Sequence, residues 1–176
     1  MSGIAKFEKV SPAQFAAGMK NNFENMSDAE ISSAYSAIKL PKRATSGSAG
    51  YDFYSVLDFE LSPGETINIP TGIRVKMEPM WALLIYPRSG LGFKYRLQLN
   101  NTVGVIDSDY YYSDNEGHIF IKITNDSREN KTVALKQGDG FAQGIFTRFG
   151  MTVDDDADEI RNGGFGSTSK GGRRDG

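Results

Sequence analysis

From about residue 40 onward, apolar and polar side chains alternate along several short segments of the chain. The alternating apolar residues are Ile67 and Ile69, then Ile73, Val75 and Met77, and then Ile119, Ile121 and Ile123. Because successive side chains of a β-strand point to opposite faces, each segment predicts a half-buried strand. Turn-forming sequences such as LSPGE, MEPM, SDNEG and KQGDG separate the segments. The pattern predicts a compact all-β fold, either an antiparallel sandwich or a barrel.

The N-terminal part of the chain differs from this pattern. Residues 4 to 10 predict a short strand, after which Ser11 predicts the N-cap of a helix because a proline follows it. Ser27 and Glu30 have the spacing of a capping box and predict the start of a second short helix. We therefore expect a helical insertion over about residues 11 to 36, packed on the outside of the β-structure.

The C-terminal part of the chain also lacks strand periodicity. An acidic run at residues 154 to 159 precedes the glycine-rich sequence RNGGFGSTSKGGRRDG. Such a composition is typical of a flexible arm. Since 176 residues fit one domain, we expect a β domain over residues 1 to 153 and an arm over residues 154 to 176.

Composition excludes several classes of protein. Twenty Lys and Arg against 22 Asp and Glu give a net charge of −2, so no overall basic field favours nucleic acid as the main partner. The absence of cysteine excludes disulfides, thiolate nucleophiles and cysteine-based metal sites. The first ten residues lack a signal-peptide pattern, and no apolar run approaches the roughly 18 residues that span a bilayer. We expect a soluble, cytoplasmic protein with no membrane partner.

Two glycine-containing segments have the residue types of an anion site. In YPRSGLG, residues 86 to 92, glycine N–H groups can approach a phosphate, Ser89 adds a hydroxyl and Arg88 adds a charged fork. An ordinary turn with a surface arginine has the same composition. GGFGSTS, residues 163 to 169, combines glycines and hydroxyls with Phe165, although its composition by itself favours a disordered glycine-rich tail. These residues alone leave both alternatives open.

The segment GVIDSDYYYSDNEGHIF, residues 104 to 120, contains two carboxylates next to three tyrosines. On an extended chain Asp107 and Asp109 point to the same face, so spacing does not select one of them as a general base. GVI predicts a strand and SDNEG the tip of a hairpin, with the tyrosines packed along it. Alternatively, the two acids lie on an edge strand, where their charges discourage aggregation. His118, the only histidine, is expected at the surface, which leaves a Ser-His-Asp or metal-histidine mechanism with little support.

Five segments, taken in order and spacing, carry a resemblance to a known family. They are SAGYDFYS (48 to 55), PRSGLG (87 to 92), NTVGVIDSDY (101 to 110), GDGFAQGIF (138 to 146) and RNGGFGST (161 to 168). This series resembles the five motifs of the homotrimeric dUTPases and covers roughly residues 40 to 168. The resemblance implies a β-barrel or jelly-roll-like subunit, a homotrimer, and active sites built from motifs of three chains. The reaction it implies is Mg²⁺-assisted hydrolysis of dUTP to dUMP and pyrophosphate by water attack on the α-phosphorus.

The resemblance also implies roles for the residues of the third motif. Asp107 matches the catalytic aspartate that activates the attacking water, and Asp109 matches a second acid with a more structural role. Tyr110 matches the tyrosine that packs on the deoxyribose and excludes a 2′-hydroxyl. The uracil edge is expected to meet the Asn101 side chain and backbone groups. The backbone groups belong to Gly104, Val105 and Ile106.

The other motifs are implied to bind the triphosphate and its metal. Arg88, Ser89 and Gly90 match the phosphate-binding motif, with Gln143 adding a polar contact. Asp52 matches the aspartate that reaches Mg²⁺ through a water molecule, which suits an ion that retains waters beside phosphates. The fifth motif is implied to close over the nucleotide as a lid. Its residues are Phe165, stacking on uracil, and Arg161, Gly166, Ser167 and Thr168, reaching the phosphates.

The chain departs from the family pattern at three places. Residues 111 to 117 form a longer connection than the short RGE-like segment of many relatives. Gly140 and Phe141 replace a basic-apolar pair, and the helical segment over about residues 11 to 36 has no counterpart in the usual short lead to the first motif. The added helices or the longer connection are therefore candidates for contacting a protein partner.

Two other functions compete with dUTP hydrolysis. A dCTP deaminase shares the implied fold and trimer, but its catalytic glutamate on the strand after the hairpin has no counterpart in HIFIKITN, residues 118 to 125. A binding or regulatory module, with hydrolysis secondary, would use the added segments instead. The presence of Asp107 and of GGFGST favours an enzyme over a scaffold.

Overall fold

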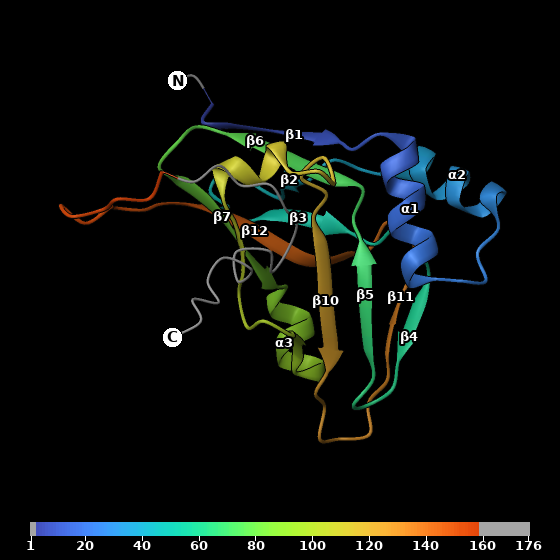
Figure 1. The fold of residues 1–176 in the computed structure, drawn as a ribbon. Coiled ribbons are helices and arrows are strands. Elements are labelled where there is room, and N and C mark those ends of the chain that lie inside the picture. The colour runs from blue at the N-terminus through green and yellow to red at the C-terminus, as the bar shows by residue number, and fades with distance from the viewer. Residues whose placement is uncertain (1–2, 159–176) are drawn as a thin grey trace, which may run out of the picture.

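The computed structural model describes residues 3 to 158, which form layers of β-strands with two helices along one side (Figure 1). The strands are β1 Ala5–Lys9, β2 Lys42–Arg43, β3 Tyr51–Tyr54, β4 Phe59–Leu61, β5 Thr66–Pro70, β6 Ile73–Met77, β7 Trp81–Pro87, β8 Leu97–Leu99, β9 Gly104–Ile106, β10 Phe120–Asn125, β11 Val133–Leu135 and β12 Gly140–Arg148. The helices are α1 Pro12–Asn22, α2 Asp28–Ala37, α3 Ser89–Tyr95 and the 3₁₀ helix η1 Ser108–Tyr112.

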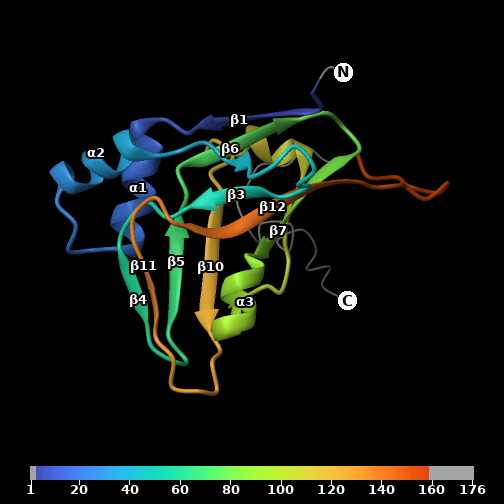
Figure 2. The ribbon, with the colours of Figure 1, turned by 180° about the vertical axis from the view of Figure 1, so that it is seen from behind.

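The strands pair antiparallel in four sheets. The largest has the order β2-β3-β12-β7-β9, and a second has the order β5-β10-β8. β1 pairs with β6, and β4 with β11. None of these sheets closes into a barrel within residues 3 to 158. The predicted all-β class is confirmed, as a jelly-roll-like arrangement with the helices at one side (Figures 1 and 2).

Alternation along the strands determines which side chains form the core. Ile73, Val75 and Met77 of β6 are buried, as the period of two predicts. Phe53 of β3 and Phe141 of β12 are fully buried as well. Removing such apolar surface from water is the main favourable term in folding, at roughly 25 cal/mol per Å². The core therefore lies between the sheets and fixes their relative positions.

Both N-terminal helices begin where the sequence predicts. The Ser11 hydroxyl accepts the Gln14 N–H at 3.1 Å, and Ser27 forms a capping box with Glu30. α1 buries Phe15 and Met19 and packs on α2 and β5. We call β1, α1 and α2, residues 5 to 37, the N-terminal unit. Within the described part of the chain, no helix is long and apolar enough to cross a membrane.

The hairpin predicted for residues 104 to 120 is wrong. β9 ends at Ile106 and pairs with β7, whereas β10 pairs with β5 and β8. Between them the chain forms η1, which buries Tyr110 and lets its hydroxyl donate to the His118 carbonyl at 2.8 Å. We call residues 107 to 118 the Asp107 loop. Because Asp109 lies within a helical turn, the two acids do not share one face of a strand.

The surface position predicted for His118 is also wrong. Its imidazole is fully buried beside the rings of Phe15 and Phe120. Nε2 accepts the backbone N–H of Gly72 at 2.9 Å, which satisfies a buried donor at a turn. Burial lowers the pKa of His118 to about 4, so the side chain is neutral at pH 7. The only histidine therefore has a structural role, because it accepts a hydrogen bond from the backbone at Gly72.

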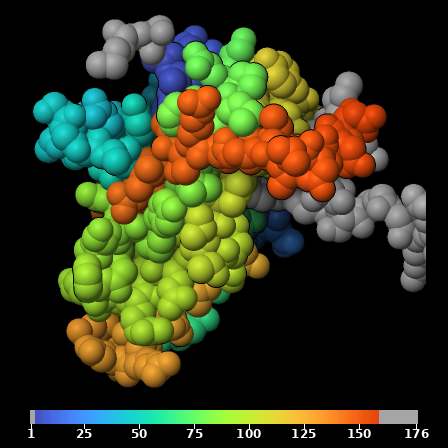
Figure 3. All heavy atoms as spheres, turned by 90° about the vertical axis from the view of Figure 1, so that its left-hand side faces the viewer, coloured from blue at the N-terminus to red at the C-terminus, as the bar shows by residue number. Residues whose placement is uncertain are grey.

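The described chain ends in a segment that leaves the β-structure. Residues 149 to 158 follow β12 and project from the body (Figure 1), and Figure 3 shows the orange segment as a ridge on the face turned to the viewer. Phe149, Met151 and Val153 alternate along it, and all three are exposed. Exposed large apolar side chains in a row are typical of a surface that contacts another molecule.

Candidate active site

Residues from three of the matched motifs surround one open pocket of about 710 Å³, which we call the phosphate pocket. Asp52 comes from β3, Gln143 from β12, and Arg88 from the end of β7. Ser89 and Gly90 form the first turn of α3. The structure thus brings together five of the residues predicted to contact the triphosphate and metal, namely those that lie within residues 3 to 158.

Strand register places these side chains. Gln143 is the register partner of Asp52 on one side and of Tyr86 on the other, so β12 joins the first and second motifs. The Arg88 Nε lies 3.3 Å from Asp52 Oδ1. The Gln143 side-chain amide donates to the Pro87 carbonyl at 3.1 Å. The Arg88 side chain is 44% exposed and lines the pocket, so its charge is available to an anion.

Gly140 explains the departure from the family pattern in the fourth motif. A Cβ at this position would lie 2.6 Å from Arg88 Nη1, and the Gly140 carbonyl accepts a hydrogen bond from that nitrogen at 3.3 Å. The glycine therefore leaves room for the Arg88 guanidinium. Phe141, the other departing residue, points into the core and is fully buried.

The second motif folds differently from the glycine-rich turn that its composition suggests. Residues 89 to 95 form the short helix α3, and Arg88 is its N-cap residue with extended backbone angles. A Cβ at Gly90 or Gly92 would meet no atom within 4 Å. The glycines are therefore not needed for packing, and they keep the surface beside Ser89 open to a ligand.

A second pocket, of about 470 Å³, contains residues predicted to read the base, and we call it the base pocket. Asn101, Gly104 and Ile106 line it. β9 is an edge strand of the five-stranded sheet, so its backbone faces outward on one side. Val105, whose backbone was predicted to meet the uracil, is on that strand with its side chain half exposed. An apolar pocket with a few amide groups suits a planar base.

Three further amide side chains line the base pocket and were not predicted from the sequence. They are Asn68, Asn100 and Asn115. Asn100 is adjacent to Asn101, so the doubled asparagine was a signal that could have been used. Asn68 and Asn115 lie far from the motif in sequence and are brought in only by the fold.

Asp107 lies one residue beyond the base pocket, at the N-cap position of η1 and half-buried. Its carbonyl accepts the Tyr110 N–H at 3.2 Å. The Tyr110 ring is 3% exposed, and Asn115 donates to its hydroxyl at 2.8 Å. Two hydrogen bonds therefore fix the hydroxyl end of this buried side chain.

Within residues 3 to 158, no residue lines both the phosphate pocket and the base pocket. The residues expected to bind phosphates and those expected to read the base therefore line different pockets of one chain. The predicted fifth motif, Arg161, Phe165, Gly166, Ser167 and Thr168, lies outside the described residues.

Comparison with known proteins shows which family this chain is similar to. The family model for dUTPase matches residues 36 to 169. The deoxyuridine 5′-triphosphate nucleotidohydrolase of Lactococcus lactis is 43% identical over 135 residues, covering 74% of this chain and 88% of that protein. The matched region begins at the end of α2, so most of the N-terminal unit lies before it.

Solved structures show the same fold. The dUTPase of Streptococcus mutans has a TM-score of 0.60 and 33% identity, covering 83% of this chain and 97% of that chain. The dUTPase of phage phi11 of S. aureus, in which a structural Mg(II) ion is coordinated, has a TM-score of 0.61 at 19% identity. That alignment covers 90% of this chain and 99% of the phage protein.

Proposed function

This chain belongs to the dUTPase family and is a dUTP diphosphatase, hydrolysing dUTP to dUMP and pyrophosphate, and we propose that Asp107 is its general base. The observation that carries the assignment is the position of Asp107, immediately after the strand that lines the base pocket. A carboxylate there is adjacent to the sugar and α-phosphate of a nucleotide whose base fills that pocket.

The proposed step is hydrolysis by one water molecule. The water oxygen bonds to the α-phosphorus as its proton passes to the Asp107 carboxylate. The bond from the α-phosphorus to the bridging oxygen breaks, and pyrophosphate leaves with that oxygen. A positioned general base contributes typically about 10²- to 10⁴-fold to such a rate.

Base selection is assigned to the backbone of β9 and to Asn101. Uracil has a donor at N3 and an acceptor at O4, and cytosine reverses both. A fixed backbone group would be left unpaired by the wrong base, at a cost of about 1 to 3 kcal/mol for each buried group. The firmly held ring of Tyr110 is the proposed filter against a 2′-hydroxyl.

Arg88, Ser89, Gly90 and Gln143 are proposed to bind the phosphates. The donor set fits an Mg²⁺ held mainly by substrate: the phosphate pocket has the Asp52 carboxylate facing Arg88, and no group of three potential metal ligands occurs within residues 3 to 158. When bound there, the ion would supply charge neutralisation on the triphosphate, and it would retain water ligands through which Asp52 could hold it.

A homotrimer with shared active sites is proposed for the assembly. The absence, within the described residues, of a shared lining residue between the phosphate pocket and the base pocket supports this, because it agrees with sites completed by a second copy. The exposed row of Phe149, Met151 and Val153 supplies apolar surface for such a contact. The arm over residues 154 to 176, with the fifth motif as a lid, completes the proposal. A protein partner at the added segments stays a prediction.

An assay with four nucleotides tests the proposed function. Purified protein is incubated with Mg²⁺ and dUTP, dCTP, dTTP or UTP, and pyrophosphate and ammonia are measured. Pyrophosphate from dUTP alone is expected. Ammonia from dCTP would identify a deaminase instead, and a correctly folded oligomer that releases neither product would favour a binding module.

A further inference from the structure

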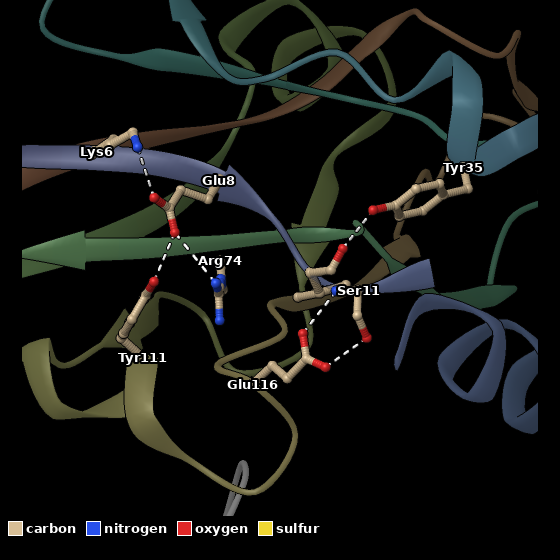
Figure 4. Close-up of polar contacts among 8 residues, drawn as sticks. Lys6, Glu8, Ser11, Tyr35, Arg74, Tyr111 and Glu116 are labelled. Carbon is tan, nitrogen blue, oxygen red and sulfur yellow. Dashed lines mark hydrogen bonds and ion pairs between the residues drawn. The ribbon is translucent and has the colours of Figure 1, made fainter. Parts of the chain in front are cut away.

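The two segments that depart most from the family pattern are in contact with each other. Glu116, in the Asp107 loop, accepts two hydrogen bonds from Ser11 at the start of α1 (Figure 4). The Ser11 backbone N–H donates to Oε2 at 2.7 Å, and its hydroxyl donates to Oε1 at 2.6 Å. The N-terminal unit is thereby joined to the Asp107 loop across 105 residues of sequence.

The two helix caps of the N-terminal unit show how unusual this contact is. In α2 the box is local, because Glu30 at the third helical position accepts both the N–H and the hydroxyl of Ser27. In α1 Gln14 occupies the same position, but the acceptor for Ser11 is the remote Glu116. The Ser11 hydroxyl accepts from Gln14 and donates to Glu116, so both of its functions are used. Glu116 of the Asp107 loop therefore takes the place of the N3 side chain that accepts from the N-cap residue in a normal capping box.

A second contact joins the same two parts of the molecule. The Tyr111 hydroxyl donates to Glu8 of β1 at 2.7 Å, and Arg74 of β6 lies 3.4 Å from that carboxylate (Figure 4). The Arg74 guanidinium also lies over the Tyr111 ring, 4.5 Å from its centroid. Hydrogen bonds from Lys6 and Tyr111 lower the pKa of Glu8 to about 2, so it is ionised at neutral pH.

Inside the Asp107 loop, hydrogen bonds and close packing connect Tyr111 and Glu116 with Asp107. The Tyr110 hydroxyl is bonded to the His118 carbonyl and to Asn115. Gly117 has φ +70°, and a Cβ there would lie 2.7 Å from the Tyr111 Cα. The loop therefore packs on its own backbone. Since Tyr111 belongs to η1 and Asp107 is the N-cap of that helix, we expect a shift of Tyr111 or Glu116 to move Asp107 as well.

We propose that Ser11, Glu8 and Glu116 are positioning residues, through which the N-terminal unit holds the Asp107 loop in its catalytic position. This rests on the proposed function of Asp107. It gives the start of α1 and the longer connection one shared task, since Ser11 contacts Glu116, while Glu8 of β1 adds the contact to Tyr111. None of the three side chains is assigned a contact with the nucleotide.

Paired substitutions distinguish an effect on the position of the Asp107 loop from an effect on the stability of a helix. Ser11→Ala and Ser27→Ala each remove one helix N-cap, which costs a similar amount of stability. Only Ser11→Ala also weakens the contact to Glu116. Glu116→Gln and Glu30→Gln form the second pair, because both carboxylates accept from a serine N–H and hydroxyl. For each pair, kcat and KM for dUTP and the unfolding temperature are measured.

We expect Ser11→Ala and Glu116→Gln to lower kcat about ten-fold with little change in KM, since a 1 Å displacement of a catalytic group can cost roughly 10²-fold. Ser27→Ala and Glu30→Gln should keep the wild-type kcat. Equal kcat values within each pair would overturn the proposal. If the wild-type protein does not hydrolyse dUTP, the proposed function fails, and the next measurement still tests the anchoring.

Amide hydrogen exchange measures the anchoring of the loop without an activity assay, and it can be compared across several variants. Tyr111→Phe removes the bond to Glu8, and Tyr112→Phe changes a neighbouring tyrosine that is 70% exposed. We expect faster exchange at the Tyr110 and Ser113 amides in Tyr111→Phe, Ser11→Ala and Glu116→Gln, and wild-type exchange in Tyr112→Phe. Unchanged exchange in the first three variants would show that the loop does not need these anchors.

Discussion

The phosphate pocket and the Asp107 loop hold the groups proposed for catalysis by different means. In the phosphate pocket, Asp52 and Gln143 face each other because their strands are paired in register. In the Asp107 loop, position depends on side chains that reach from β1 and the start of α1. Backbone pairing is repeated along a strand, whereas each side-chain contact is single. The loop should therefore be the more sensitive of the two regions to one substitution.

Among the substitutions that test this difference, Asp107→Asn is expected to change kcat the most. Removing the general base should lower kcat by about 10²- to 10⁴-fold while nucleotide binding is kept, because the phosphate pocket is unchanged. Steady-state kinetics gives kcat, and calorimetry with a slowly hydrolysed analogue gives Kd. Asp114→Asn, the same charge change at an exposed position of the loop, is the control. An undiminished kcat in Asp107→Asn would remove this residue as the base.

Gly117→Ala tests the internal packing of the Asp107 loop. The added Cβ meets backbone at 2.7 Å, and φ +70° is unfavourable for alanine, so η1 must shift. Strain of this kind costs on the order of 1 to 3 kcal/mol. We expect a lower unfolding temperature and a kcat reduced more than about ten-fold. Gly47→Ala, where the Cβ meets nothing within 4 Å, should match wild type. Wild-type kinetics in Gly117→Ala would mean that the loop adjusts freely.

His118 links the stability of the loop to pH. Its pKa is about 4 when folded and about 6.5 when unfolded. The unfolded state therefore binds the proton first, and the stabilisation present above pH 6.5 is lost as pH falls toward 4. Between pH 6.5 and 5 the loss should be about 2 kcal/mol.

Urea unfolding at both pH values, for wild type and His118→Gln at one protein concentration, measures this loss. Glutamine keeps an acceptor for the Gly72 N–H without a titrating group. The stability difference between the two proteins should shrink on acidification. A difference that is independent of pH would place the titration elsewhere.

Gly140→Ala has the smallest expected effect and acts on the phosphate pocket. The new Cβ would lie 2.6 Å from the end of the Arg88 side chain, which can rotate away. Folding should be unaffected, because only a flexible side chain moves. We expect KM for dUTP to rise a few-fold, with a smaller change in kcat, as a phosphate contact is weakened. A large fall in kcat with unchanged KM would instead assign Arg88 to the transition state alone.

Local patterns predicted several strands and both helix caps, and the resemblance to the family supplied the residues of the phosphate pocket. The caps depend on residues three apart, and the pocket residues belong to motifs that could be recognised in order. Periodicity did not separate a hairpin from η1 after Ile106, because the burial of Tyr110 is decided by its bond to His118. The contact of Ser11 with Glu116 spans 105 residues and has no local signal. The burial of His118 likewise depends on a turn at Gly72.

Mixing two inactive variants tests most directly whether the Asp107 loop and the phosphate pocket of different chains form one site. Asp107→Asn and Arg88→Ala are each purified, then unfolded and refolded together in equal amounts, and mixed oligomers are verified by mass. In a three-fold ring with sites shared between chains, about one quarter of wild-type activity should return. Mixed oligomers that stay inactive would contradict the account, because both groups would then have to come from the same chain.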